Sequence, residues 1–272
     1  MSTVSHHSAQ PAPGTVYLVG AGPGDPELIT VRGLRCLRQA DVLLYDRLVH
    51  PALLGEVPAA AEKIFVGKAP GRPGVGQAEI HRLLIEHAAR GAIVVRLKGG
   101  DPFIFGRGSE EAADLQAAGI PWEVVPAISS AFGVPARAGI PLTHRRLARS
   151  FTVVTGHTVG QGDFNWSALA AAETLVVLMG VKALPTIVRR LALHGKSLST
   201  PVAVIERGTM AEERVLTGTL ATITEVAAGA RSPAVIVIGE VVHVRENLLA
   251  AMPFAPLLEN QAPSRFDSEK RP

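Results

Sequence analysis

The sequence contains a single cysteine, Cys36, and few aromatic residues, which make up 4% of the chain. One cysteine permits neither an intramolecular disulfide bond nor a metal centre built from several thiolates. The scarcity of aromatic rings argues against a single-stranded nucleic-acid groove lined with stacking side chains. No apolar run reaches the roughly 18 residues that a transmembrane helix needs, and no lysine or arginine precedes Arg32 to form the basic region of a signal peptide. We therefore expect a soluble, cytoplasmic protein.

Charged residues are also sparse, at 19% of the chain against roughly 25% in an average soluble protein. The 27 lysines and arginines exceed the 24 aspartates and glutamates only slightly, which gives a formal net charge of +3. A mild basic balance of this kind suggests an anionic small molecule as readily as a nucleic acid. Hydrophobic residues make up 47% of the 272 positions, which excludes a disordered chain, collagen and a coiled coil.

Short β-branched runs alternate with helical patterns along the chain. The runs are apolar on both faces, which is typical of parallel strands covered by helices. Predicted strands occupy 15–19, 41–45, 63–66, 92–97, 122–125, 151–155, 174–179, 201–205 and 234–238. Patterns with an apolar helical stripe occupy 31–40, 78–89, 109–119, 182–195 and 219–229.

The alternation breaks at 138–150, where Pro141 precedes a group of arginines, so we predict a domain boundary near residue 147. The predicted fold class is α/β, with two α/β domains, mostly parallel sheets and a cleft between the domains. The domains are predicted at 15–147 and 148–252. Residues 1–14 and 253–272 are rich in proline, serine and polar groups without periodicity, which predicts two flexible tails.

A first glycine-rich loop, VGAGPGDP, occupies 19–26. A dinucleotide-binding turn would have a third glycine where Asp25 stands. Pro23 and Pro26 each remove a backbone N–H that a bound phosphate would use. The pattern therefore disfavours a dinucleotide and leaves two readings open, a simple glycine turn or a site for another ligand.

A second loop, RLKGGDPFIFGRG at 96–108, is the stronger candidate for a binding site. Gly99 and Gly100 let the backbone approach a ligand closely, and Asp101 offers a carboxylate to a cationic centre or to a pair of hydroxyls. Ser129 and Ser130 follow the next predicted strand. Helix capping explains one of these serines, whereas two in succession also permit a contact with a ligand.

Acid–base candidates stand at the ends of other strands. Asp46 follows the second predicted strand and Lys68 the third, so both can face one crevice. Basic residues gather near the predicted boundary: Arg107, Arg137, His144, Arg145 and Arg146. They form either a solvated patch or a rim that binds carboxylates. No paired cysteines, His-x-x-x-His pattern or carboxylate cluster occurs, so we predict no metal site.

Eight segments occur in an order that matches one known family: VGAGPGDPELIT, YDRLV, VGK, VVRLKGGDPFIFGRG, GIPLTHR, VTGH, LMG and PAVIVIGEVV. In these segments, over about residues 15–250, the chain resembles the tetrapyrrole methylases, most closely those that act on uroporphyrinogen III. The resemblance implies S-adenosylmethionine as the cofactor and a homodimer. It also implies methylation of uroporphyrinogen III at C-2 and C-7, which gives precorrin-2 by way of precorrin-1 for siroheme- or cobalamin-type biosynthesis.

The same resemblance implies roles for residues at matching positions. S-adenosylmethionine would contact Pro23, Gly99, Gly100, Asp101, Ile104, Ser129, Ser130, Met179 and Gly208. Asp46 would accept a proton and Lys68 would donate one. The substrate carries many carboxylates, for which the basic rim provides partners: Arg107, His144, Arg145 and Arg146. With such a substrate the small net charge favours a carboxylated macrocycle, so we expect neither nucleic acid nor membrane as the partner.

Two residues depart from the family pattern. Ala127 stands where glycine is common and is strained if that position needs a positive φ, and Arg137 replaces a small or tyrosyl residue. Two alternatives stay open: a methyltransferase for a later corrin intermediate or for ribosomal RNA ribose, and a non-catalytic protein that binds a tetrapyrrole or a dinucleotide. Siroheme enzymes of the family carry a dehydrogenase and chelatase region, for which residues 1–14 leave no room, so we expect the methyltransferase unit alone.

Overall fold

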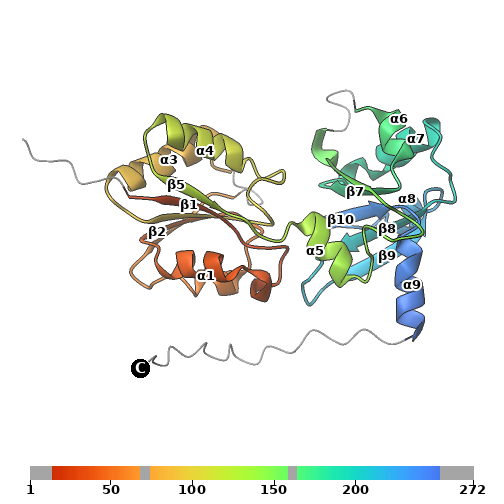
Figure 1. The fold of residues 1–272 in the computed structure, drawn as a ribbon, viewed down its shortest axis with the longest axis horizontal. Coiled ribbons are helices and arrows are strands. Elements are labelled where there is room, and N and C mark those ends of the chain that lie inside the picture. Colours follow the sequence, from red (N-terminus) through yellow and green to blue (C-terminus); the bar gives the residue numbers. More distant parts are fainter. Residues whose placement is uncertain (1–13, 68–73, 159–163, 252–272) are drawn as a thin grey trace, which may run out of the picture.

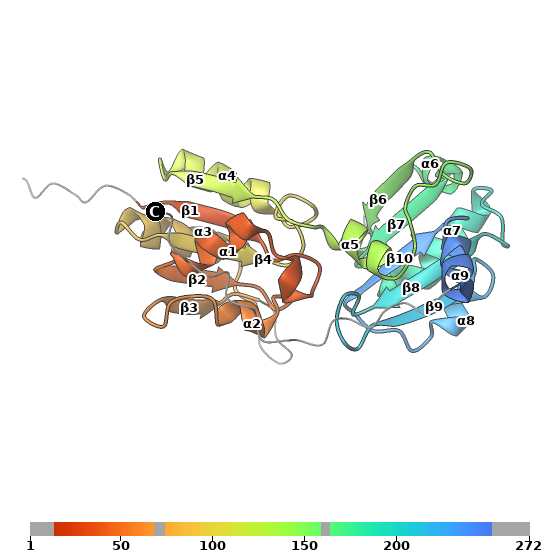
Figure 2. The ribbon, with the colours of Figure 1, turned by 60° about the horizontal axis from the view of Figure 1, so that its bottom comes forward.

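The computed structural model describes residues 14–67, 74–158 and 164–251, which form two α/β units lying side by side (Figure 1 and Figure 2). Each unit contains a five-stranded sheet with helices packed on both faces. The α/β class predicted from the sequence is thus confirmed. In the described part of the chain, no helix has the length and apolarity needed to cross a membrane.

The first unit is built on a fully parallel sheet with the strand order β3-β2-β4-β1-β5. Its strands are β1 (Val16–Gly20), β2 (Val42–Tyr45), β3 (Glu62–Phe65), β4 (Val94–Lys98) and β5 (Trp122–Val125). Its helices are the short 3₁₀ helix η1 (Pro26–Leu28), α1 (Val31–Arg38), α2 (Pro51–Leu54), α3 (Gln77–Ala89) and α4 (Gly108–Ala117). Helices α1 and α2 cover one face and α3 and α4 the other, which is why the central strands are apolar on both sides.

This arrangement positions the glycine-rich loops. Because all five strands are parallel, their carboxyl ends lie at one edge of the sheet, where ligands of open α/β sheets bind. The loops after β1 and β4 are direct neighbours there, since these two strands pair over their whole length, from Val16 with Val94 to Gly20 with Lys98.

The second unit has the strand order β6-β7-β10-β8-β9. Its strands are β6 (Phe151–Thr155), β7 (Thr174–Leu178), β8 (Pro201–Glu206), β9 (Arg214–Thr219) and β10 (Ala234–Ile238). Its helices are α5 (Ser130–Arg137), α6 (Trp166–Ala171), α7 (Leu184–Leu193), α8 (Ile223–Val226) and α9 (Val242–Ala251), with the 3₁₀ helices η2 (Gly156–Thr158) and η3 (Val181–Ala183). Helices α6, α7 and α8 pack on one face of the sheet, and α5 and the start of α9 on the other.

The second sheet is mixed, so the expectation of mostly parallel strands holds for the first sheet and fails for this one. Only β6 and β7 are parallel, whereas β10 runs antiparallel to β7 and β8, and β9 runs antiparallel to β8. Helices on both faces of a sheet bury its strands on both sides, whether the strands run parallel or antiparallel. Residues 207–213 join β8 to β9, too short a connection for the crossover of a dozen or more residues that parallel neighbours need.

Helix α5 follows β5 in the chain but belongs to the core of the second sheet. Ala131 and Val134 share a buried cluster with Val176, Ile205 and Val237 of that sheet, and Figure 1 shows α5 at the junction of the two units. The second core therefore begins ahead of the boundary predicted near residue 147. The predicted tails, 1–14 and 253–272, lie outside the described residues except for Gly14.

Candidate functional site

The loops that follow β1 and β4 are joined to each other by backbone hydrogen bonds. Ala21 N donates to the Lys98 carbonyl at 2.8 Å, and Gly22 and Gly100 exchange two further bonds of 3.2 and 2.7 Å. Gly22 has φ +82° and Gly100 has φ +68°, a backbone region that glycine adopts without a steric penalty. The two glycine-rich segments predicted separately therefore form one structure.

Asp101 ties this structure to the segment after β5. Its Oδ1 accepts a bond of 2.8 Å from Phe103 N and its Oδ2 accepts one of 3.0 Å from Ala127 N. A Cβ on Gly20 would stand 2.4 Å from the Ala127 Cβ, so only glycine fits there. Ala127 is not among the residues with positive φ, so the strain considered for it does not arise.

The serine pair lies against the same loops. Ser129 caps α5 by accepting a bond of 3.3 Å from Ala131 N, as capping chemistry predicts. A Cβ on Gly100 would lie 3.6 Å from Ser130 N. The start of α5 thus brings both serines to the carboxyl edge of the first sheet.

The second unit reaches the site through the loop after β8. Thr209 Oγ1 accepts a bond of 3.0 Å from Asp25 N, across 184 positions of sequence. A Cβ on Gly24 would lie 2.8 Å from Thr209 Oγ1 and 3.2 Å from the Gly208 carbonyl. Pro23 lies against α5, where a Cβ on Gly133 would stand 3.0 Å from its Cγ. Pro23 and Gly208, predicted to contact one cofactor, therefore lie at the same junction.

Five non-glycine residues in the described chain adopt positive φ, and all of them follow the carboxyl ends of strands. They are Phe105 (φ 51°), Arg107 (59°), Met179 (54°), Arg207 (44°) and Thr209 (70°). Such conformations cost of order 1–3 kcal/mol each and cluster at ligand sites. The strain thus marks the loops after β4 and β8, which the contacts above also identify, and adds the loop after β7.

The predicted cofactor residues differ in how closely they meet. Six of them lie on segments joined by the contacts above: Pro23, Gly100, Asp101, Ser129, Ser130 and Gly208. Gly99 faces Leu48 instead, since a Cβ on Gly99 would stand 3.2 Å from the Leu48 Cβ. Ile104, after β4, and Met179, after β7, have exposed side chains, at 38% and 51% relative exposure.

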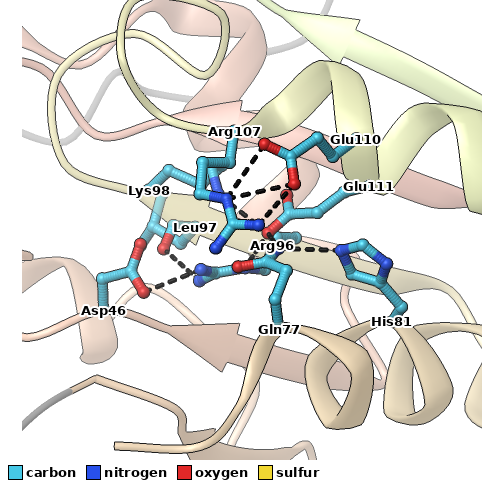
Figure 3. Close-up of polar contacts among 9 residues, drawn as sticks. All are labelled: Asp46, Gln77, His81, Arg96, Leu97, Lys98, Arg107, Glu110 and Glu111. Atoms are coloured by element: carbon cyan, nitrogen blue, oxygen red, sulfur yellow. Dashed lines mark hydrogen bonds and ion pairs between the residues drawn. The ribbon is translucent and has the colours of Figure 1, made fainter. Parts of the chain in front are cut away.

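Asp46 lies at the carboxyl end of β2 and is part of a polar network beneath these loops (Figure 3). Its Oδ1 accepts a bond of 2.7 Å from Arg96 Nη2. Arg96 is 2% exposed and also donates from Nε to Glu111 Oε1 at 3.1 Å. Lys68, the partner predicted for Asp46, lies outside the described residues.

Glu111 and Lys98 complete this network. Lys98 Nζ donates to Glu111 Oε1 at 2.8 Å, and Glu111 is fully buried. Burial, followed by the charge of Arg96, lowers the pKa of the Lys98 ammonium. Glu111 Oε2 has no hydrogen-bond partner among the described residues.

The residues predicted as a substrate rim are exposed or half-buried. Arg107 pairs with Glu110 one helical turn away, with 2.5 Å between Nη2 and Oε2, and this bond lowers the pKa of the Glu110 carboxyl. His144 Nδ1 accepts a bond of 3.3 Å from Arg146 N. Arg145 and Arg146 expose their side chains in the same turn. Within the described ranges, no group of three or more histidine, cysteine, aspartate or glutamate side chains gathers as a metal site would require.

Four residues of the site escaped the sequence predictions: Arg96, Lys98, Glu111 and Thr209. Two charges inside an apolar strand, at Arg96 and Lys98, are a signal that could have revealed a buried network. Glu111 gives no such signal, since acidic residues are ordinary in a first helical turn. Thr209 is distant in sequence from the loop that it contacts.

Comparison with known proteins gives a consistent result. The family model described as "Tetrapyrrole (Corrin/Porphyrin) Methylases" matches residues 15–224. The chain is 51% identical over 244 residues to a siroheme synthase of Pseudomonas paraeruginosa, covering 88% of this chain and 52% of the relative. It is 54% identical over 237 residues to siroheme synthase 2 of Aeromonas hydrophila, covering 86% and 50%. The chain thus spans about half the length of these curated relatives.

Two solved structures are similar over nearly their whole length. One is the uroporphyrin-III C-methyltransferase from Thermus thermophilus complexed with S-adenyl homocysteine, with 45% identity, a TM-score of 0.75 and coverage of 85% of this chain and 100% of that one. The other is a cobalamin biosynthetic enzyme, cobalt precorrin-4 methyltransferase, with 29% identity, a TM-score of 0.75 and coverage of 84% and 95%.

Proposed function

Because the chain belongs to the tetrapyrrole (corrin/porphyrin) methylase family, we propose that it transfers methyl groups from S-adenosylmethionine to uroporphyrinogen III. The products are precorrin-1 and then precorrin-2, methylated at C-2 and C-7. The observation that carries the proposal is the 45% identity to the Thermus thermophilus enzyme over all of that chain. The siroheme synthases among the relatives support a role in siroheme-type biosynthesis.

The junction between the two units has a form that suits S-adenosylmethionine. Gly100 and Gly208 bring backbone close to the junction without a side chain, and a Cβ on Gly208 would stand 2.3 Å from Val134 Cγ1. Ile104 and Met179 supply exposed apolar side chains on the loops after β4 and β7. Asp101 binds backbone N–H groups with both carboxylate oxygens, so its proposed part is to shape the loop that holds the cofactor. When bound, the cofactor supplies an electrophilic methyl group on a sulfonium.

Methyl transfer of this kind is an in-line displacement, so the protein's main task is to align a pyrrole carbon with the methyl group and to exclude water. Methylation leaves a positive charge on the macrocycle, which is neutralised when another position of the ring system loses a proton. Asp46 is the proposed acceptor, since it is partly exposed at the carboxyl edge of the sheet and is oriented by Arg96. Lys68 is the proposed donor.

The substrate carries carboxylates around its ring, for which guanidinium groups are good partners. We propose that Arg107, His144, Arg145 and Arg146 form this rim. Arg107 is paired with Glu110, so substrate binding exchanges or shares that partner. We further propose that the protein is cytoplasmic and forms a homodimer. Large exposed apolar side chains, Phe103 and Phe105 among them, support the dimer. Light scattering of the purified protein tests the dimer.

Anaerobic incubation with uroporphyrinogen III and methyl-labelled S-adenosylmethionine tests the activity. We expect two equivalents of label on the macrocycle. Likeness to the cobalt precorrin-4 methyltransferase makes a later corrin intermediate the second candidate substrate. Label on that compound with none on uroporphyrinogen III would replace the proposal, and label on neither would refute it.

A further inference from the structure

The carboxylate of Glu111 is the centre of the polar network shown in Figure 3. Its Oε1 accepts three bonds: from Lys98 Nζ at 2.8 Å, from Arg96 Nε at 3.1 Å and from Gln77 Nε2 at 3.2 Å. The side chain is fully buried, and it stands in the first turn of α4, where the helix dipole favours a negative charge. Glu111 is therefore held as the counter-charge to two buried cations.

A network of this kind is not the most stabilising way to fill a core. Each buried ion carries a desolvation cost of several kcal/mol, and apolar residues of similar volume are often as stabilising as a buried ion pair. Arg96 and Lys98 are 2% and 3% exposed, so both depend on their partners. The presence of the network is therefore better explained by the side chains that it orients than by stability alone.

Asp46 connects this buried network to the proposed active site. Arg96 holds Glu111 with Nε and Asp46 with Nη2 at 2.7 Å, so one planar guanidinium joins the buried carboxylate to the partly exposed one. The Asp46 side chain is 31% exposed, in contrast to Glu111. Glu111 is bonded to Lys98 Nζ and to Arg96 Nε, so Asp46 accepts a bond from one nitrogen of Arg96, Nη2.

The far side of Glu111 is closed by α3. Gln77 Nε2 donates to Glu111 and lies 2.8 Å from His81 Nε2, and an amide nitrogen is a donor only. His81 Nε2 is therefore the acceptor, and His81 Nδ1 carries the proton in its bond with Asp114. On this side Gln77, His81 and Asp114 already form a chain of hydrogen bonds, and the Asp114 carboxylate is bonded to His81.

We propose that Glu111 is a positioning residue of the methyl-transfer site, which keeps Arg96 and Lys98 from enclosing Asp46. The inference rests on the proposed function, in which Asp46 accepts the proton released after methylation. Without the Glu111 charge, both cations turn to Asp46, the other carboxylate to which Arg96 is bonded. Asp46 is then drawn inward and loses the oxygen that must meet the substrate.

The kinetic test uses Glu111→Gln, which retains the size of the side chain and removes its charge. We expect kcat for methyl transfer to fall about 10- to 100-fold, the cost of a misplaced catalytic group, with affinity for S-adenosylhomocysteine within about twofold of the parent. Glu111→Asp, which keeps the charge, recovers part of kcat and covers the case in which the amide variant does not fold.

Two further variants identify the route of the effect. In the Asp46→Asn background, Glu111→Gln adds little further loss if it acts through Asp46, whereas independent effects would multiply. Lys98→Met in the Glu111→Gln background removes the surplus cation and restores part of kcat. Glu123→Gln is the matched control, since Glu123 on β5 pairs with the exposed Arg32 of α1, and its kcat equals that of the parent.

A crystal structure of Glu111→Gln decides the inference without any assay. We expect Lys98 Nζ or a second nitrogen of Arg96 on Asp46, with lower exposure of Asp46 than in the parent. Asp46 in its parent position, parent-like kcat in Glu111→Gln, or multiplicative effects with Asp46→Asn would each overturn the inference. A parent protein that methylates no tetrapyrrole would refute the proposed function instead, while the crystal structure still reports on Asp46.

Discussion

At the scale of single residues, Thr209 combines conformational strain with a contact between the two units. It is a β-branched residue at φ 70°, and it is 2% exposed. The left-handed conformation costs about 1–2 kcal/mol for such a residue. Two hydrogen bonds offset that cost, from Asp25 N to Thr209 Oγ1 at 3.0 Å and from Thr209 N to Glu213 Oε2 at 2.8 Å. The side-chain oxygen is thus the part of Thr209 that joins the units.

Thr209→Val tests this contact, because valine keeps the shape and lacks the acceptor. Asp25 N–H then remains without its partner, which costs about 1–3 kcal/mol for a buried polar group. Urea denaturation measures the loss of unfolding free energy. Thr209→Ser keeps the hydroxyl and serves as the control, with a smaller loss than valine. Equal losses in the two variants would show that the hydroxyl contributes nothing.

Lys98 gives a prediction for the pH dependence of stability. Burial and the charge of Arg96 hold its folded-state pKa below the ordinary value of 10.5, so between those two values the unfolded chain binds more protons than the folded one. Unfolding free energy therefore rises with pH across that window. Lys98→Met removes this contribution, so the parent gains stability relative to the variant as the pH approaches 10.5. Denaturation at a series of alkaline pH values checks the slope, and a constant difference between the two proteins contradicts it.

At the scale of elements, α5 packs closely against the loop after β8 within the second unit. A Cβ on Gly208 would stand 2.3 and 2.8 Å from the two Val134 methyl carbons. The close approach of loop and helix is therefore possible only because Gly208 lacks a side chain. Backbone φ at Gly208 does not require glycine, so sterics alone restrict this position.

Gly208→Ala is expected to destabilise the fold by about 1–3 kcal/mol, the usual cost of overpacking. Val134→Ala removes both clashing methyl groups at the expense of a cavity. The double variant should then lose less than the sum of the single losses, because the two residues share the same space. Denaturation of all four proteins measures the coupling. Additive losses would mean that α5 and the loop shift apart freely.

At the scale of the whole molecule, the proposed cofactor site draws residues from both units, with Pro23 and Gly100 in the first and Gly208 and Met179 in the second. A ligand that binds such a site stabilises both units together. At 100 times its Kd, a ligand adds about 2.7 kcal/mol to the unfolding free energy. The two tryptophans report on the units separately, since Trp122 lies on β5 and Trp166 begins α6.

We therefore expect S-adenosylhomocysteine to raise the unfolding midpoint seen by both tryptophans. Trp122→Phe and Trp166→Phe variants leave one reporter each, and fluorescence during denaturation follows it. A nicotinamide dinucleotide is the matched control ligand and is expected to shift neither midpoint. A shift of one tryptophan alone would assign the ligand to a single unit.

The α/β class and the loops that contain the glycines and serines could be predicted from short stretches of sequence. A strand buried on two faces and a turn of the chain each leave a signal within a few neighbouring residues. Such signals could not give strand direction in the second sheet, since helices on both faces produce the same apolar runs whichever way a strand points. Strand β9 was missed because, as an edge strand, it is only partly buried.

Three features depended on contacts between distant segments. Helix α5 joined the second core through apolar partners in β7, β8 and β10. Asp46 met Arg96 across 50 positions, and Asp25 met Thr209 across 184. The sequence thus specified which segments turn and which are buried, because those properties are local. The fold specified which charges share a buried space, because desolvation and pairing depend on neighbours that the chain brings together only when it is folded.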